Sequence, residues 1–128
     1  MGSLDIRDLH PPPGQPSLYR LQRDGKTEAL EGEYALINLL PGVVPGRYIM
    51  VLGGISTIGT QAAAEFATSA DYMQAVARAL GGPREKPRAS PYFQVLLRVQ
   101  IRDGVNAKTS CLLVRKLEFQ QQVRLGTR

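Results

Sequence analysis

Tyr48–Thr60, with the sequence YIMVLGGISTIGT, decides the fold, because an apolar run, a glycine-rich turn and the start of a helix follow one another within it. The run Tyr48–Leu52 carries no charge, a pattern typical of a strand that is covered on both faces. Gly53-Gly54 ends the run, and from about Ile58 onward good helix formers follow. We therefore expect a central strand, a tight turn and a helix.

Upstream of this segment the sequence predicts further strands. Residues 33–40 (EYALINLL) form a short apolar run that suits either a strand or a helix, and we favour a strand. Residues 17–23 alternate in polarity and lead into Asp24-Gly25, a typical hairpin turn, with the chain returning over residues 27–31. Four prolines within residues 4–16 predict an extended segment before this hairpin.

Downstream, the sequence predicts a second helix and a long hairpin. Ser69 has the position of a helix N-cap, and Asp71 lies in the first turn, where it complements the helix dipole. A basic, proline-rich loop follows at residues 83–91. Residues 92–117 then alternate in polarity on both sides of Asp103-Gly104, which predicts two antiparallel strands joined by a tight turn.

Together these elements predict a fold of the α/β class, with α+β as the alternative. We expect a mixed, largely antiparallel sheet with two helices between a central strand and the C-terminal β-hairpin. At 128 residues, 43% of them hydrophobic, the chain suits one domain with its own core. We assign residues 17–118 to this domain, residues 1–16 to a tag remnant and an extended proline-rich segment, and residues 119–128 to a frayed basic tail.

The composition argues against several kinds of site and setting. Cys111 is the only cysteine and His10 the only histidine, which excludes an intrachain disulfide and a four-ligand Cys/His zinc site. We expect no membrane span and no signal peptide, because no apolar run approaches the roughly 18–20 residues that a membrane helix needs. These observations predict a cytoplasmic protein without a metal or cofactor, in which Cys111 is buried in a strand.

Positive charge gathers in the C-terminal third of the chain. Residues 1–83 have a net charge of −2 and residues 84–128 a net charge of +7. Such a balance indicates either an anionic partner or a solvated strand face with a basic tail. The residues of a nucleic-acid surface would be Arg98, Arg102, Lys108, Arg115 and Lys116. We do not favour this reading, because an RNA-binding face interleaves aromatic with basic residues and this one does not.

The glycine-rich turn is the candidate ligand site. Glycines allow backbone amides to approach a ligand closely, and a helix N-terminus offers unpaired donors with a partial positive charge. The candidate residues for a small anionic ligand are Gly53, Gly54, Ser56, Thr57, Gly59 and Thr60. The alternative is structural: the glycines make a tight turn, and Ser56 or Thr57 caps the helix.

Known catalytic patterns fail at this turn. Gly54 and Gly59 have the spacing of a P-loop, but Thr60 follows where that motif needs lysine. The segment also resembles the cofactor turn of short-chain dehydrogenases, in which Thr57 would be the missing middle glycine. No tyrosine in the chain has the lysine four residues later that this family uses. We therefore expect no enzymatic activity and assign no catalytic residue.

Four short segments resemble an uncharacterised bacterial α/β module. These segments are Tyr34-Ala35-Leu36-Ile37, Leu40-Pro41-Gly42, Gly46-Arg47 and Gly59-Thr60-Gln61-Ala62-Ala63-Ala64-Glu65. The module occurs in regulatory proteins that carry a helix-turn-helix region upstream, and the resemblance covers roughly residues 15–117. It implies a sensory or regulatory domain. This chain has no helix-turn-helix of its own, so the resemblance does not imply that it binds DNA.

The sequence thus predicts a non-enzymatic domain that binds a ligand or a protein partner in a bacterial regulatory protein. The alternative is a nucleic-acid-associated module that uses the basic face of the C-terminal hairpin. Because a small mixed sheet leaves strand edges open, we also expect a homodimer formed by strand addition or helix packing.

Overall fold

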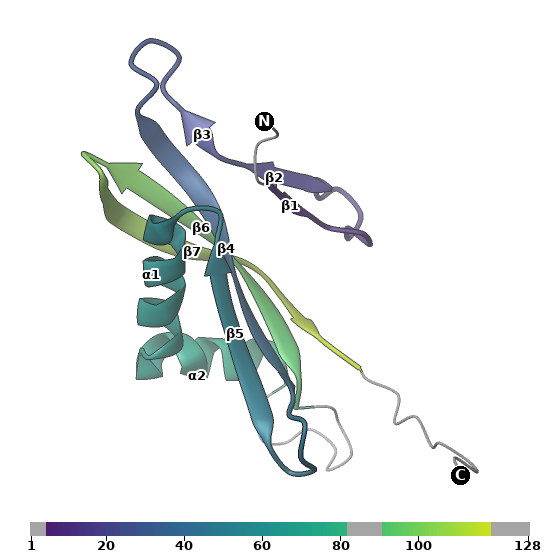
Figure 1. The fold of residues 1–128 in the computed structure, drawn as a ribbon. Coiled ribbons are helices and arrows are strands. Elements are labelled where there is room, and N and C mark those ends of the chain that lie inside the picture. The colour runs from purple at the N-terminus through teal and green to yellow at the C-terminus, as the bar shows by residue number, and fades with distance from the viewer. Residues whose placement is uncertain (1–4, 82–90, 119–128) are drawn as a thin grey trace.

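The computed structural model describes residues 5–81 and 91–118 of the chain. The predicted tail 119–128 and all but one residue of the predicted loop 83–91 lie outside the described residues. The elements, in chain order, are β1 (Asp5–Arg7), β2 (Leu18–Arg20), β3 (Gln22–Arg23), β4 (Leu30–Pro41), β5 (Tyr48–Gly54), α1 (Thr57–Ala67), α2 (Ala70–Ala79), β6 (Phe93–Arg102) and β7 (Val105–Lys116). Figure 1 shows both helices on one side of the long strands.

The main sheet is built around β4. β6 pairs with β4 on one side, and β7 continues the sheet beyond β6. On the other side of β4, the short β3 pairs near its start and β5 pairs with residues 35–41. All these pairings are antiparallel. The predicted class is confirmed as α+β: the sheet is antiparallel, and two helices lie between β5 and the C-terminal hairpin.

The core lies between this sheet and the helices. Alternate residues of β4 and β6 point toward α1, because successive side chains of a strand face opposite ways. The buried strand residues of this cluster are Ala35, Ile37, Phe93, Val95, Leu97, Val99 and Ile101. From the helices come Ala62, Ala63, Phe66 and Val76. The small side chains of α1 allow the helix to lie close against the sheet.

Both predicted helices are present, and each begins after a serine. Ser69 is the N-cap of α2 and accepts a hydrogen bond from the Tyr72 amide, as predicted. Asp71 in the first turn and Arg78 in the last complement the helix dipole. Neither α1 nor α2, the helices of the described residues, has the length and apolarity to cross a membrane.

The predicted C-terminal hairpin is confirmed. Asp103 and Gly104 both have positive φ, 53° and 76°, which is the requirement of the two-residue turn that matches strand twist. Two register shifts interrupt the β6–β7 pairing and leave Ala107 and Leu112 as extra residues of β7. The prediction that Cys111 is buried is wrong: the residue is exposed on β7, which is an edge strand.

The N-terminal segment packs over the face of the sheet that the helices leave open. β1 and β2 form a separate two-stranded ribbon, and Figure 1 shows it on the side of β4 away from α1. The residues after β1 line a cavity together with Leu36, Leu96 and Leu113 of the main sheet. Within the described part of this segment, residues 5–7 are extended as β1 and residues 12–15 form a turn. Asp8 is joined to Arg115 of β7.

The position of the run Tyr48–Leu52 corrects the sequence analysis. We expected a central strand, but β5 pairs with β4 alone and is an edge strand. Its first four residues are exposed rather than covered on both faces. The central position belongs to β4, whose apolar run was ambiguous in the sequence. An uncharged run satisfies the pattern of a buried strand, but it does not reveal how many neighbours the strand has.

Candidate functional site

The glycine-rich turn is held by a carboxyl group from the neighbouring strand. Glu33 of β4 is fully buried and faces the start of α1. Its Oε1 atom accepts the Ser56 backbone amide at 2.9 Å, and its Oε2 atom accepts the Ser56 hydroxyl. A negative group suits this position, because a helix N-terminus carries unpaired amides and a partial positive charge.

The two glycines nearest this contact allow the helix to approach the strand. A Cβ atom on Gly59 would overlap the Oε1 atom of Glu33, and one on Gly54 would overlap the backbone of Gly59 and Thr60. Neither position has room for a side chain. At Gly53, by contrast, a Cβ would meet nothing within 4 Å. Gly54 and Gly59 are therefore required for packing, and Gly53 is not.

The hydroxyl of Thr60 also serves the turn. It accepts the Gly54 backbone amide at 2.9 Å and donates to the Ser56 carbonyl at 3.2 Å. Ser56 is the N-cap residue of α1, but its side chain makes no cap bond to the helix and bonds Glu33 instead. Thr57 is exposed in the first turn. Ser56 is thus the N-cap residue by position, but its side chain does not cap the helix. Its bonds to Glu33 hold the start of α1 against β4 instead.

This geometry bears on the predicted anion site. An external anion bound at the Ser56 amide would have to share that donor with the buried Glu33, a group of the same charge sign when ionised. The turn residues Gly53, Gly54, Ser56, Thr57, Gly59 and Thr60 do lie together, as the sequence indicated. Their binding of a small anionic ligand stays a prediction.

Thr60→Val tests which role the turn plays. The substitution removes the hydroxyl at nearly constant volume and leaves the Gly54 amide without its acceptor. We expect the free energy of unfolding to fall by about 0.5–2 kcal/mol, measured by denaturant titration. Binding of phosphate, followed by the melting temperature, should be the same for both proteins. A variant of unchanged stability that no longer binds phosphate would assign the hydroxyl to a ligand instead.

The five basic residues predicted for a nucleic-acid surface do not all lie on one face of the C-terminal hairpin. Cross-strand partners share a face of a sheet, and the register places Arg98, Arg102, Lys108 and Arg115 on the face away from the helices. Lys116 pairs with the core residue Phe93 and therefore lies on the helix face. The hollow of about 510 Å³ that Arg98 and Arg102 line also contains Glu31 and Asp103. This mixed charge gives the nucleic-acid alternative no support.

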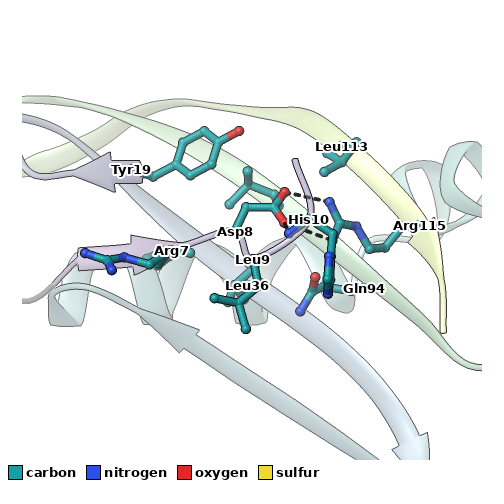
Figure 2. A pocket seen from close by; sticks show the side chains of 11 residues that line it. Arg7, Asp8, Leu9, His10, Tyr19, Leu36, Gln94, Leu113 and Arg115 are labelled. Atoms are coloured by element: carbon teal, nitrogen blue, oxygen red, sulfur yellow. Dashed lines mark hydrogen bonds and ion pairs between the residues drawn. The ribbon is translucent and has the colours of Figure 1, made fainter. Parts of the chain in front are cut away.

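Arg115 is engaged in a contact within the chain. Its guanidinium donates two hydrogen bonds to Asp8, of 2.7 and 3.2 Å, and the His10 amide donates to the same carboxyl at 2.9 Å. These bonds, first of all those from Arg115, lower the pKa of Asp8 below its ordinary value. Both residues line a cavity of about 260 Å³, and Figure 2 shows the bonds between them. The pair fastens the N-terminal segment to β7.

Exposed apolar side chains concentrate on β5 and the turn before it. The large apolar residues that are exposed within the described parts of the chain are Leu9, Val43, Val44, Tyr48, Ile49, Met50, Val51, Tyr72, Val105 and Leu112. Six of these ten lie between residues 43 and 51. The side chains of β5 alternate between the two faces of the sheet, so both faces of this strand expose apolar groups. Exposed apolar side chains that gather in this way are a candidate surface for contact with another molecule. Sequence reasoning missed this surface because it placed Tyr48, Ile49, Met50 and Val51 inside the sheet.

Backbone hydrogen bonds at the two ends of β5 show which of its residues direct their N–H and C=O groups toward β4. The Ile55 amide donates to the Tyr34 carbonyl, and the Gly42 amide donates to the Arg47 carbonyl. Bonded and non-bonded residues alternate along an antiparallel pair. The residues that bond β4 are therefore Ile49, Val51 and Gly53. The residues whose N–H and C=O groups point to the free edge are Tyr48, Met50, Leu52 and Gly54, and the Gly54 amide is already bonded to Thr60.

The two long edges of the sheet differ in how they are protected. Proteins discourage pairing at an exposed edge with bulges and charged side chains. β7 has both: two register shifts and the charged residues Lys108, Arg115 and Lys116. β5 has no charged residue and no register shift against β4. Of these two edges, only β5 is suited to accept another strand.

Within residues 5–81 and 91–118, no three His, Cys, Asp or Glu side chains come together as a metal site requires. Comparison of the chain with protein-family models, with curated proteins and with solved structures found no match. The resemblance to a bacterial regulatory module therefore stays a prediction.

Proposed function

We propose that this chain is a non-enzymatic, partner-binding domain whose docking element is the free edge of β5. The observation that carries the proposal is the combination of exposed apolar side chains and outward-facing backbone groups on one uncharged strand. Such a strand binds an extended segment by adding it to the sheet: backbone hydrogen bonds provide affinity, and alternate side chains provide specificity.

The rest of the sheet supports this assignment by keeping β5 in place. β5 pairs with β4 over seven residues, and α1 packs against both strands. The Thr60 hydroxyl bonds the Gly54 amide, so the open part of the edge ends at Leu52. A rigid strand that is already extended binds a partner at a lower cost in conformational entropy than a loop does.

Two further parts of the proposal rest on sequence. The resemblance to a bacterial regulatory module supports a regulatory role, and the single cysteine supports a cytoplasmic setting. In such a role the domain recognises its partner through β5 and performs no chemistry on it.

Selection from a display library of short random peptides tests the docking element. We expect uncharged peptides of alternating apolar residues to be enriched, because they match the exposed side chains of β5. Met50→Lys should weaken their binding at least about tenfold, because it replaces apolar contact worth about 1–2 kcal/mol with a charge on the edge. Fluorescence anisotropy with the enriched peptides measures the change.

Leu112→Lys is the matched control. Leu112 lies on the other edge of the sheet and is 46% exposed, against 44% for Met50. The control variant should bind the peptides as the unmodified protein does. If no peptide is enriched, or if both lysine variants bind equally, β5 is not the docking element.

A further inference from the structure

We infer that the strand added to β5 is β5 of a second copy of this chain, paired antiparallel about a twofold axis at Met50. This inference rests on the proposed function and names the partner.

The open part of the edge is symmetric about Met50. Its outward-facing residues are Tyr48, Met50 and Leu52, spaced evenly along the strand. Beyond Leu52, the Gly54 amide is occupied by Thr60. When two antiparallel strands pair, residues that face the partner must lie opposite residues that also face it. Only the register that places Met50 opposite itself pairs all three, with each Tyr48 opposite Leu52 of the second copy.

The same register matches the side chains. On the helix side of the sheet, Tyr48 lies beside Leu52 of the second copy, and the two Met50 side chains are neighbours. On the other side, Ile49 lies opposite Val51 of the second copy. Apolar cross-strand pairs of this kind stabilise a sheet. The four most exposed residues of β5 all gain an apolar neighbour.

No charge on β5 opposes pairing with a second copy. Like charges directly opposite one another destabilise a strand pair, and no residue of β5 is charged. Arg47, just before the strand, falls opposite Gly53 of the second copy. β7, with its bulges and basic residues, is a poor partner for β5. The pairing therefore closes as a dimer rather than continuing as an open chain.

Disulfide crosslinking tests the partner and the register together. In a Cys111→Ser background, Met50→Cys should give covalent dimers under mild oxidation. Paired Cα atoms at a hydrogen-bonded site lie about 5.5 Å apart, within the range that a disulfide spans. Tyr48→Cys should not crosslink to itself, because Tyr48 lies opposite Leu52. Leu112→Cys, equally exposed on the other edge, is the control for random collision.

Sedimentation equilibrium gives the strength of the pairing. Met50→Pro removes an outward amide that β4 does not use, and both copies lose one bond to the partner. We expect the dissociation constant to rise at least about 30-fold. Met50→Lys, which keeps every backbone group, should show the same direction and serves if the proline variant does not fold.

Three results would overturn the inference. They are a monomer at high micromolar concentration, crosslinking of Leu112→Cys as efficient as that of Met50→Cys, and preferential crosslinking of Tyr48→Cys. None of them decides the proposed function, because the peptide selection measures the docking of an extended strand on β5 whether or not the chain pairs with itself.

Discussion

Gly59→Ala is expected to lower the free energy of unfolding by about 3–5 kcal/mol. The added methyl group would overlap the Oε1 atom of Glu33, which is fully buried and bonded to Ser56. Either α1 moves away from the sheet or the carboxyl group leaves its donors. Forced overpacking costs about 1–3 kcal/mol, and a buried polar group that loses its partner costs about as much again. Denaturant titration followed by circular dichroism measures the sum.

Two variants assign this cost to Glu33. Gly53→Ala, where the new methyl group meets nothing within 4 Å, should change stability by less than about 1 kcal/mol. In a Glu33→Ala background the oxygen that causes the overlap is absent. Gly59→Ala should then cost at least about 1 kcal/mol less than in the unmodified protein. If Gly59→Ala lowers the free energy of unfolding equally in both backgrounds, overlap with Glu33 is not the cause of the loss.

The elements that sequence could predict are those whose signals are local. Asp103-Gly104 determines a two-residue turn, and the alternation on both sides of it indicates a hairpin. Ser69 followed by Asp71 identifies a helix start. Each of these patterns depends on a few neighbouring residues, and the structure contains all of them.

The order of the strands depends on contacts that local patterns do not record. Tyr48–Leu52 is an uncharged edge strand, and the same composition suits a strand inside the sheet. The run at 33–40 suits a strand or a helix by its sequence, although it lies in β4, which has neighbouring strands on both sides, as β6 does. Its apolar residues alternate between the helix layer and the face near the N-terminal ribbon, so both sets are covered.

Glu33 of β4 bonds the glycine-rich turn, and the sequence analysis did not predict this contact. Glu33 stands 23 positions before Ser56, and only the pairing of β4 with β5 brings the two together. The available signal was a single acidic residue at the start of an apolar run. An acidic residue there is expected to be solvated, unless a helix N-terminus lies against it.

The order of strands is tested by two substitutions of the same residue type. Ile37 of β4 is fully buried between Val95 and Leu52, whereas Ile49 of β5 is 42% exposed. At high dilution, Ile37→Ala should cost about 3–4 kcal/mol, as buried isoleucines do. Ile49→Ala should cost less than about 1 kcal/mol. If both substitutions lower the free energy of unfolding equally at high dilution, β5 is not an edge strand and lies inside the sheet, as the sequence alone predicted.

Protein concentration extends this comparison to the dimer. If β5 pairs with a second copy, Ile49 gains a covered neighbour only when two chains associate, so the cost of Ile49→Ala should grow as the protein concentration rises. The cost of Ile37→Ala should stay constant, because its neighbours belong to the same chain. Any ligand or partner that binds the native state alone stabilises it by mass action. A concentration-dependent cost at Ile49, absent at Ile37, therefore places the edge of β5 in the interface between copies.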